Sequence, residues 1–173
     1  GKQLVTTEEM CAKVAAARKA RTHLRIVART DAVANEGLEG GIARAKAYVA
    51  AGADYAFADG LTDADGFRRF AAECGAPFMA NMTEFGKTPY LTAREFEELG
   101  CKLVIWPVSS MRVAAKAMER VYGELAQKDT LFDHLDQMQT RAELYETIGY
   151  HEFETLDASV ATTIVPDDHR SKG

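Results

Sequence analysis

The sequence lacks the features that mark several large classes of protein. Its three cysteines, Cys11, Cys74 and Cys101, form no CxxC pair, so neither a disulfide framework nor a zinc site is indicated. No apolar run approaches the roughly 20 residues that a membrane-spanning helix needs. The four histidines show no spacing typical of metal ligands, and we assign none of them a catalytic role. We expect the cysteines to be small buried side chains.

Basic residues are too scattered to indicate nucleic-acid binding. Lys and Arg number 21 against 26 Asp and Glu, and they are spread along the chain instead of forming a stripe. The composition, 47% hydrophobic and 27% charged over 173 residues, is otherwise that of a globular protein with a sizeable core. We therefore expect a small-molecule ligand, no nucleic-acid or membrane partner, and a cytoplasmic location.

Four segments repeat the pattern of a short β-prone run followed by an amphipathic helix. The predicted strands are centred near Val27, Phe57, Met79 and Ile105. The predicted helices span about 7–20, 37–52, 62–75, 92–100 and 111–125, and the first of them precedes the repeats. This order predicts a parallel sheet with helical crossovers.

Two architectures accept such repeats, an open doubly wound sheet and a closed β/α barrel, and periodicity alone does not choose between them. A dinucleotide-binding sheet needs a Gly-x-Gly-x-x-Gly turn directly after a strand. The nearest sequence, GLEGG at 37–41, has the wrong spacing and lies at a helix start. A barrel typically takes about 250 residues, so four units make half of one.

The character of the chain changes after residue 127. Residues 128–154 predict two further helices, the second running from a capping box at Thr140 and Glu143 to Gly149. Residues 155–173 are expected to form a polar tail. We therefore divide the chain into four βα units at 1–127, C-terminal helices at 128–154 and the tail.

Polar residues follow the predicted strands at the end where β/α enzymes build their active sites. Arg29 ends the first strand in an apolar context, and a guanidinium there needs an anionic ligand or an internal salt bridge to Asp31 or Asp59. Asp59 follows the second strand. It is either a carboxylate associated with a metal or a plain helix cap.

The third and fourth strands end in further candidates. Asn81 and Thr83 supply neutral donors and acceptors that suit a hydroxy acid, or they form a simple turn. Arg112 lies in the first turn of a helix, where the dipole disfavours it unless it clamps an anion; the alternative is a solvated surface arginine. We expect Arg29, Asp59, Asn81 and Arg112 to share one rim of the sheet.

Four blocks of the sequence carry a resemblance to a known family. They are ARTDA at 28–32, ANMTEFGKTP at 80–89, WPVSSMR at 106–112 and MQTRAELY at 138–145. Together they closely resemble successive blocks of the bacterial 2-methylisocitrate lyases, in the isocitrate lyase and phosphoenolpyruvate mutase superfamily. The match runs from about Gly1 to Glu154.

The resemblance implies a homotetrameric (β/α)8 TIM-type barrel, of which this chain is the C-terminal half with extra C-terminal helices. Its activity would be the Mg²⁺-dependent cleavage of 2-methylisocitrate, a tricarboxylate, to pyruvate and succinate in propionate degradation. Family members exchange a C-terminal helix between subunits, so we expect the helices after Lys128 to leave their own sheet. The substrate-binding residues carried over are Arg29, Asp59, Asn81, Thr83, Arg112 and Arg141.

In the family, the Mg²⁺-binding aspartates and the acid cysteine belong to an N-terminal half that would end just before Gly1. We therefore expect no catalytic residue and no direct metal ligand in this chain. Asp59 stands where the family usually has Glu, and its shorter carboxylate either contacts the water shell of the metal or no longer reaches it. Two alternatives stay open: a related lyase or hydrolase acting on another 2-hydroxy or 2-oxo acid, and a non-catalytic half-barrel paralogue.

Overall fold

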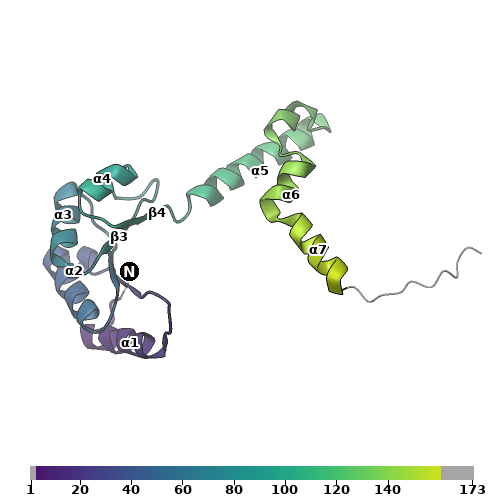
Figure 1. Ribbon diagram of the computed structural model, residues 1–173. Helices are drawn as coiled ribbons and strands as arrows, with labels where there is room; N and C mark the ends of the chain where they lie inside the picture. Colours follow the sequence, from purple (N-terminus) through teal and green to yellow (C-terminus); the bar gives the residue numbers. More distant parts are fainter. Residues whose placement is uncertain (1–2, 161–173) are drawn as a thin grey trace, which may run out of the picture. The chain divides into compact units, whose positions relative to one another are not determined.

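The computed structural model describes residues 3–160, which form two compact units dividing between Ala117 and Met118 (Figure 1). The first unit holds the four strands, and the second holds the C-terminal helices. The elements are α1 Thr7–Ala20, β1 Val27–Thr30, α2 Val33–Ala50, β2 Tyr55–Ala58, α3 Ala64–Glu73, β3 Phe78–Asn81, α4 Ala93–Glu98, β4 Leu103–Ile105, α5 Ser109–Lys128, η1 Phe132–Gln137, α6 Arg141–Ile148 and α7 Tyr150–Val160.

The strands form one parallel sheet in the order β1-β2-β3-β4, which confirms the four predicted βα units. Arg29 lies opposite Phe57, Phe57 opposite Met79, and Met79 opposite Leu103. Side chains alternate between the faces of a strand. In this register, the odd-numbered residues of all four strands therefore share one face of the sheet.

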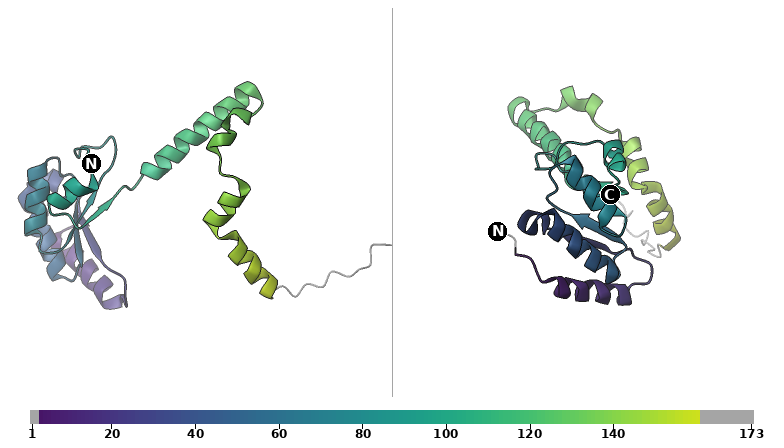
Figure 2. Two further views of the ribbon diagram at one scale, coloured as in Figure 1. Left: turned by 45° about the horizontal axis from the view of Figure 1, so that its top comes forward. Right: turned by 90° about the vertical axis from the view of Figure 1, so that its left-hand side faces the viewer.

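The even-numbered face is covered by helices. Figures 1 and 2 show α2, α3 and α4 on the same side of the sheet. Phe78 packs with its ring centroid 4.8 Å from that of Phe70 and 6.1 Å from that of Phe67. The strands place small alanines beside these rings, so the helices approach closely and exclude water. The main buried residues of this core are Ile42, Ala45, Ala56, Ala58, Phe67, Phe70, Phe78, Ala80 and Phe96.

The odd-numbered face presents a mixture of buried and exposed side chains. Phe57 and Met79, on the two central strands, are buried. Val27 and Leu103, on the two outer strands, are 38% and 42% exposed. Apolar surface left open in this way is typical of a face that packs against another part of an assembly.

Local capping signals place the starts of three helices, α1, α4 and α6, where the sequence predicts them. The Thr6 side chain accepts a hydrogen bond from the Glu9 amide at 3.1 Å, and Thr92 and Thr140 each form a complete capping box. The predicted stop at Gly52 is also confirmed, because α2 ends just before it. Gly52 has a φ of 116°, a backbone conformation that residues with a side chain rarely adopt.

Three helix starts differ from the prediction. The helix expected from Gly37 begins at Val33, with a kink at Gly37 where φ is 74° and ψ is −179°. Helix α3 is capped by the Asp63 carboxylate, which accepts from the Gly66 amide at 2.8 Å, and not by Thr62. Helix α5 already includes Ser109, so this serine lies in the first turn and not before it.

The second unit differs from the expected domain bounds. Its division from the first unit falls inside α5, ten residues before the expected boundary at 127. The segment after Thr130 is a 3₁₀ helix, η1. Helix α7 extends to Val160, so 155–160 are helical and not part of a tail; the rest of the expected tail lies outside the described residues. Exchange of these helices between subunits stays a prediction.

No helix within residues 3–160 combines the length and the apolar character needed to span a membrane.

Candidate active site at the carboxyl ends of the strands

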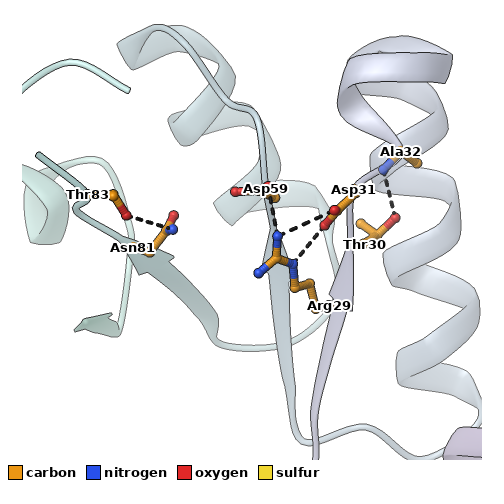
Figure 3. A network of polar contacts seen from close by, with 7 residues as sticks. All are labelled: Arg29, Thr30, Asp31, Ala32, Asp59, Asn81 and Thr83. Atoms are coloured by element: carbon orange, nitrogen blue, oxygen red, sulfur yellow. Dashed lines mark hydrogen bonds and ion pairs between the residues drawn. The ribbon is translucent and has the colours of Figure 1, made fainter. Parts of the chain in front are cut away.

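Arg29 is the centre of a charged cluster at the carboxyl ends of β1 and β2 (Figure 3). Its Nε donates to Asp31 Oδ1 at 2.7 Å, and its Nη2 donates to Asp59 Oδ2 at 2.8 Å. The guanidinium carbon lies 5.1 Å from the centroid of the Phe57 ring. Both internal partners considered for Arg29 from the sequence are therefore present.

The cluster is held together but remains accessible. The hydrogen bond with Asp31 raises the pKa of Arg29 above its ordinary value, and the charge of Asp59 adds to this effect. The Arg29 side chain is still 47% exposed. The guanidinium can therefore bind a hydroxyl or a carboxylate, and the negatively charged aspartates beside it attract a cation.

A cavity of about 510 Å³ lies beside the two aspartates of this cluster. Lys87 lies on its wall, together with the backbone turn after β2. Sequence reasoning did not select Lys87, whose only signal was its place in the block at 80–89. The complete lining is Asp31, Ala34, Asn35, Asp59, Gly60, Thr62 and Lys87.

Asn81 and Thr83 lie at the end of the neighbouring strand, β3. The Asn81 side-chain amide donates to the Thr83 hydroxyl at 3.2 Å. Figure 3 shows this pair beside the charged cluster, at the same edge of the sheet. Because parallel strands bring their carboxyl ends to one edge, the predicted common rim is confirmed for Arg29, Asp59 and Asn81. Their part in substrate binding stays a prediction.

Arg112 lies in the first turn of α5, after β4, and is bound to the loop that follows β3. Its Nη1 donates to the Glu84 carbonyl oxygen at 2.6 Å, and the guanidinium carbon lies 5.4 Å from the centroid of the Phe85 ring. The side chain is 42% exposed. Arg112 is therefore not a plain solvated arginine, although the sequence did not reveal Glu84 as its partner.

Arg141 is the first residue of α6, directly after the capping residue Thr140. It is exposed and belongs to the second unit. It is the one predicted site residue that lies outside the first unit.

Cysteine thiols and a preformed metal site are not features of the rim. Cys74 and Cys101 are buried as expected, and Cys11 is partly buried. Burial raises the pKa of the Cys101 thiol to about 11 and that of Cys74 above its ordinary value, which disfavours a thiolate. Across residues 3–160, no group of three His, Cys, Asp or Glu side chains could hold a metal ion.

The chain is similar to proteins of one known family. The model of the phosphoenolpyruvate phosphomutase family matches residues 1–126. A 2-methylisocitrate lyase of Bacillus subtilis (strain 168) is 49% identical over 168 residues, which cover 97% of this chain and 56% of that protein. The chain spans about half the length of the curated relatives it matches.

Solved structures share the fold of this chain. The crystal structure of 2,3-dimethylmalate lyase, a PEP mutase/isocitrate lyase superfamily member, has a TM-score of 0.82 at 30% identity. The match covers 93% of this chain and 58% of the chain of that lyase. A phosphonopyruvate hydrolase in complex with oxalate and Mg²⁺ has a TM-score of 0.76 at 24% identity, covering 91% of this chain and 57% of its own. The four-stranded sheet is thus about half of a TIM-type barrel.

Proposed function

This chain belongs to the phosphoenolpyruvate phosphomutase family, and we propose that it is part of a lyase that cleaves 2-methylisocitrate to pyruvate and succinate. The observation that carries the proposal is the 49% identity to a curated 2-methylisocitrate lyase over nearly the whole chain. The polar rim at the carboxyl ends of the strands supports it, because enzymes built on this fold place their chemistry there.

The reaction requires charge to move in a defined direction. The hydroxyl group of the substrate loses its proton, the adjacent carbon–carbon bond breaks, and the oxygen becomes the carbonyl oxygen of pyruvate. The electron pair of the broken bond passes to the succinate carbon, which then takes up a proton. Groups that hold the substrate carboxylates and compensate this charge accelerate the step.

The rim residues match these demands. Arg29 and Arg112 each present a partly exposed guanidinium that can pair with a carboxylate of the substrate, and Arg141 is proposed as the third such cation. Asn81 and Thr83 are proposed to hydrogen-bond the substrate, with the Asn81 amide already oriented by the Thr83 hydroxyl. Three arginines suit the three carboxylates of the substrate.

Mg²⁺ is proposed as the cofactor of the whole enzyme, supported by the phosphonopyruvate hydrolase that binds it. The described residues do not form its ligand set. Asp31 and Asp59 are the carboxylates of the charged cluster, and both pair with Arg29. A hard cation needs several converging oxygen ligands, so we assign Asp59 only a contact with the water shell of the metal.

A second candidate function is cleavage of a related dicarboxylate such as 2,3-dimethylmalate. Two observations favour it: the structural match to 2,3-dimethylmalate lyase at 30% identity, and the shorter carboxylate of Asp59 where the family usually has Glu. A shift in the reach of this side chain would change which substituents the site accepts.

The remaining proposals concern the location, the pathway and the oligomeric state of the enzyme. We place it in the cytoplasm, in the degradation of propionate, as a homotetramer without nucleic-acid or membrane partners. Size-exclusion chromatography with light scattering of the full-length protein tests the oligomer. A mass of one or two protomers would contradict it.

The activity is tested with the full-length protein and three substrates, 2-methylisocitrate, isocitrate and 2,3-dimethylmalate, each assayed with Mg²⁺ for its ketoacid or aldehyde product or for loss of substrate. We expect 2-methylisocitrate to have the highest kcat/KM. A preference for 2,3-dimethylmalate would support the second candidate, and no turnover of any substrate would indicate a non-catalytic paralogue.

A further inference from the structure

Glu84 joins the loop after β3 to the first turn of α5. Its carboxylate Oε1 accepts a hydrogen bond from the Ser109 hydroxyl, and its backbone carbonyl accepts one from Arg112 Nη1 at 2.6 Å. Its Oε2 lies 3.6 Å from the same guanidinium nitrogen. One residue therefore holds both the start of the helix and the cation that this helix carries.

The next residue along the loop completes the enclosure of Arg112. Phe85 has a φ of 64°, a conformation that residues other than glycine seldom adopt. In this conformation its ring centroid lies 5.4 Å from the guanidinium carbon of Arg112. The arginine is thus held between a backbone carbonyl and an aromatic ring.

Burial and charge make Glu84 an effective anchor. Its side chain is 20% exposed, and its Oε2 is buried without a hydrogen-bond partner among residues 3–160. The hydrogen bond from Ser109 lowers the pKa of Glu84, so the carboxylate stays charged at neutral pH. Arg112 keeps 42% of its side chain exposed, which leaves the guanidinium accessible to a ligand.

We infer that Glu84 is a positioning residue, which holds Arg112 in the orientation that receives a substrate carboxylate. The inference rests on the proposed function, in which Arg112 binds substrate. A free arginine side chain loses its rotational freedom each time it binds, whereas an anchored one has lost it already. A carboxylate that keeps its charge through the reaction is bound equally in the ground and transition states, so losing the anchor raises KM more than it lowers kcat.

The test uses the full-length enzyme with Glu84→Ala, Glu84→Gln and Ser109→Ala. Steady-state kinetics with 2-methylisocitrate give kcat and KM, and calorimetry with succinate gives the affinity for a dicarboxylate without turnover. The matched control is Glu73→Ala, which removes a carboxylate partner of Arg69 on helix α3.

Glu84→Ala is expected to raise KM and the succinate Kd about tenfold while kcat changes less than about twofold. Glu84→Gln keeps an oxygen acceptor for Ser109 and should recover both constants to within about threefold of wild type. Ser109→Ala should fall between these two, and it tests the anchor even where Glu84→Ala does not fold. Glu73→Ala should leave both constants unchanged.

Two results would overturn the inference in distinguishable ways. If the wild-type enzyme binds succinate and turns over 2-methylisocitrate, but the Glu84 and Ser109 variants behave like Glu73→Ala, the positioning role is wrong and the proposed function stands. If the wild-type protein neither binds the dicarboxylate nor cleaves the substrate, the proposed function fails and the inference fails with it.

Discussion

Each end of the sheet carries an arginine paired with aspartate, but the pair is largely buried at the amino ends and exposed at the carboxyl ends. At the amino ends of the strands, Arg21 donates to both oxygens of Asp54, which also accepts from the Ile26 amide at 2.8 Å. At the carboxyl ends, Arg29 binds Asp31 and Asp59. The Arg21 and Asp54 side chains are each 14% exposed, whereas Arg29 is 47% exposed.

This difference in exposure separates a structural ion pair from a candidate site. The Arg21–Asp54 pair is closed by the backbone of the loop before β1 and leaves little surface for a ligand. The Arg29 cluster remains exposed and borders a cavity of about 510 Å³. Function on this fold is expected where polar groups remain accessible at the carboxyl ends, and stability where they are closed off at the amino ends.

The largest effect we expect is the loss of all lyase activity in the 173-residue chain alone. Among residues 3–160 no set of side chains converges as metal ligands, and the outer strands expose Val27 and Leu103. The measurement is pyruvate release from 2-methylisocitrate with Mg²⁺, with a calorimetric Mg²⁺ titration and light scattering to detect self-association. Turnover close to that of the full-length protein would show that the carboxyl-end cluster is sufficient by itself.

The next effect concerns Arg29→Lys in the full-length enzyme. Lysine keeps the charge but cannot donate to Asp31 and Asp59 from one planar group, so the cluster loses its geometry. We expect kcat/KM to fall about 100-fold, since misplaced binding groups have effects of this size. The thermal midpoint should change little. A large loss of stability with unchanged kcat/KM would show that Arg29, like Arg21, forms an ion pair that stabilises the fold and does not bind substrate.

The amino-end pair should show the reverse behaviour in Asp54→Asn, with lower stability and unchanged kcat/KM. The hydrogen bond from Arg21 lowers the pKa of Asp54 to about 2, from an ordinary value of 3.8. A carboxylate whose pKa is lowered by folding stabilises the protein above its unfolded pKa, and this contribution is lost as the pH falls toward the folded value.

Thermal unfolding of wild type and Asp54→Asn across pH 2 to 7 measures this contribution. The difference in midpoint should be several degrees above about pH 4 and should shrink toward zero near pH 2. Asp65→Asn is the control, because the pair that Asp65 forms with Arg68 at 3.5 Å is exposed. A pH-independent difference would show that the charge of Asp54 is not the stabilising feature.

Local sequence patterns predict much of the fold, but they predict less of the candidate site. Thr92 and Thr140 begin helices through capping boxes that lie within four residues of sequence, and glycines end them. The kink at Gly37 was missed because the glycine adopts a φ of 74° and a ψ of −179°, and the helix continues on both sides of it instead of starting there. Helix α7 was missed because the predicted helix ends at Gly149, and no Ser, Thr, Asp or Asn cap marks the start of a new helix at Tyr150.

At the site, residue types at strand ends predicted which side chains share the rim. The partners of those side chains depend on contacts far apart in sequence. The Arg21–Asp54 pair spans 33 residues, and the Glu84–Arg112 pair spans 28. No local pattern encodes such pairs, so periodicity and capping could place Arg112 on its helix without revealing what holds it.

The smallest effect we expect is that of Asp59→Glu, which restores the residue typical of the family. Arg29 Nη2 lies 2.8 Å from Asp59 Oδ2, and the Asp59 side chain is 30% exposed, so one added methylene can extend into the cavity without a steric clash with a closed core. The charge of the cluster is unchanged. We expect kcat/KM for 2-methylisocitrate to change by no more than about fourfold, since one methylene is worth about 0.8 kcal/mol. The informative quantity is the ratio of kcat/KM for 2-methylisocitrate to that for 2,3-dimethylmalate, measured in wild type and variant under the same Mg²⁺ concentration. A rise in this ratio would show that the length of the Asp59 side chain affects substrate choice. An equal change for both substrates would show that Asp59 acts as a partner of Arg29, as Asp54 does for Arg21 at the other end of the sheet.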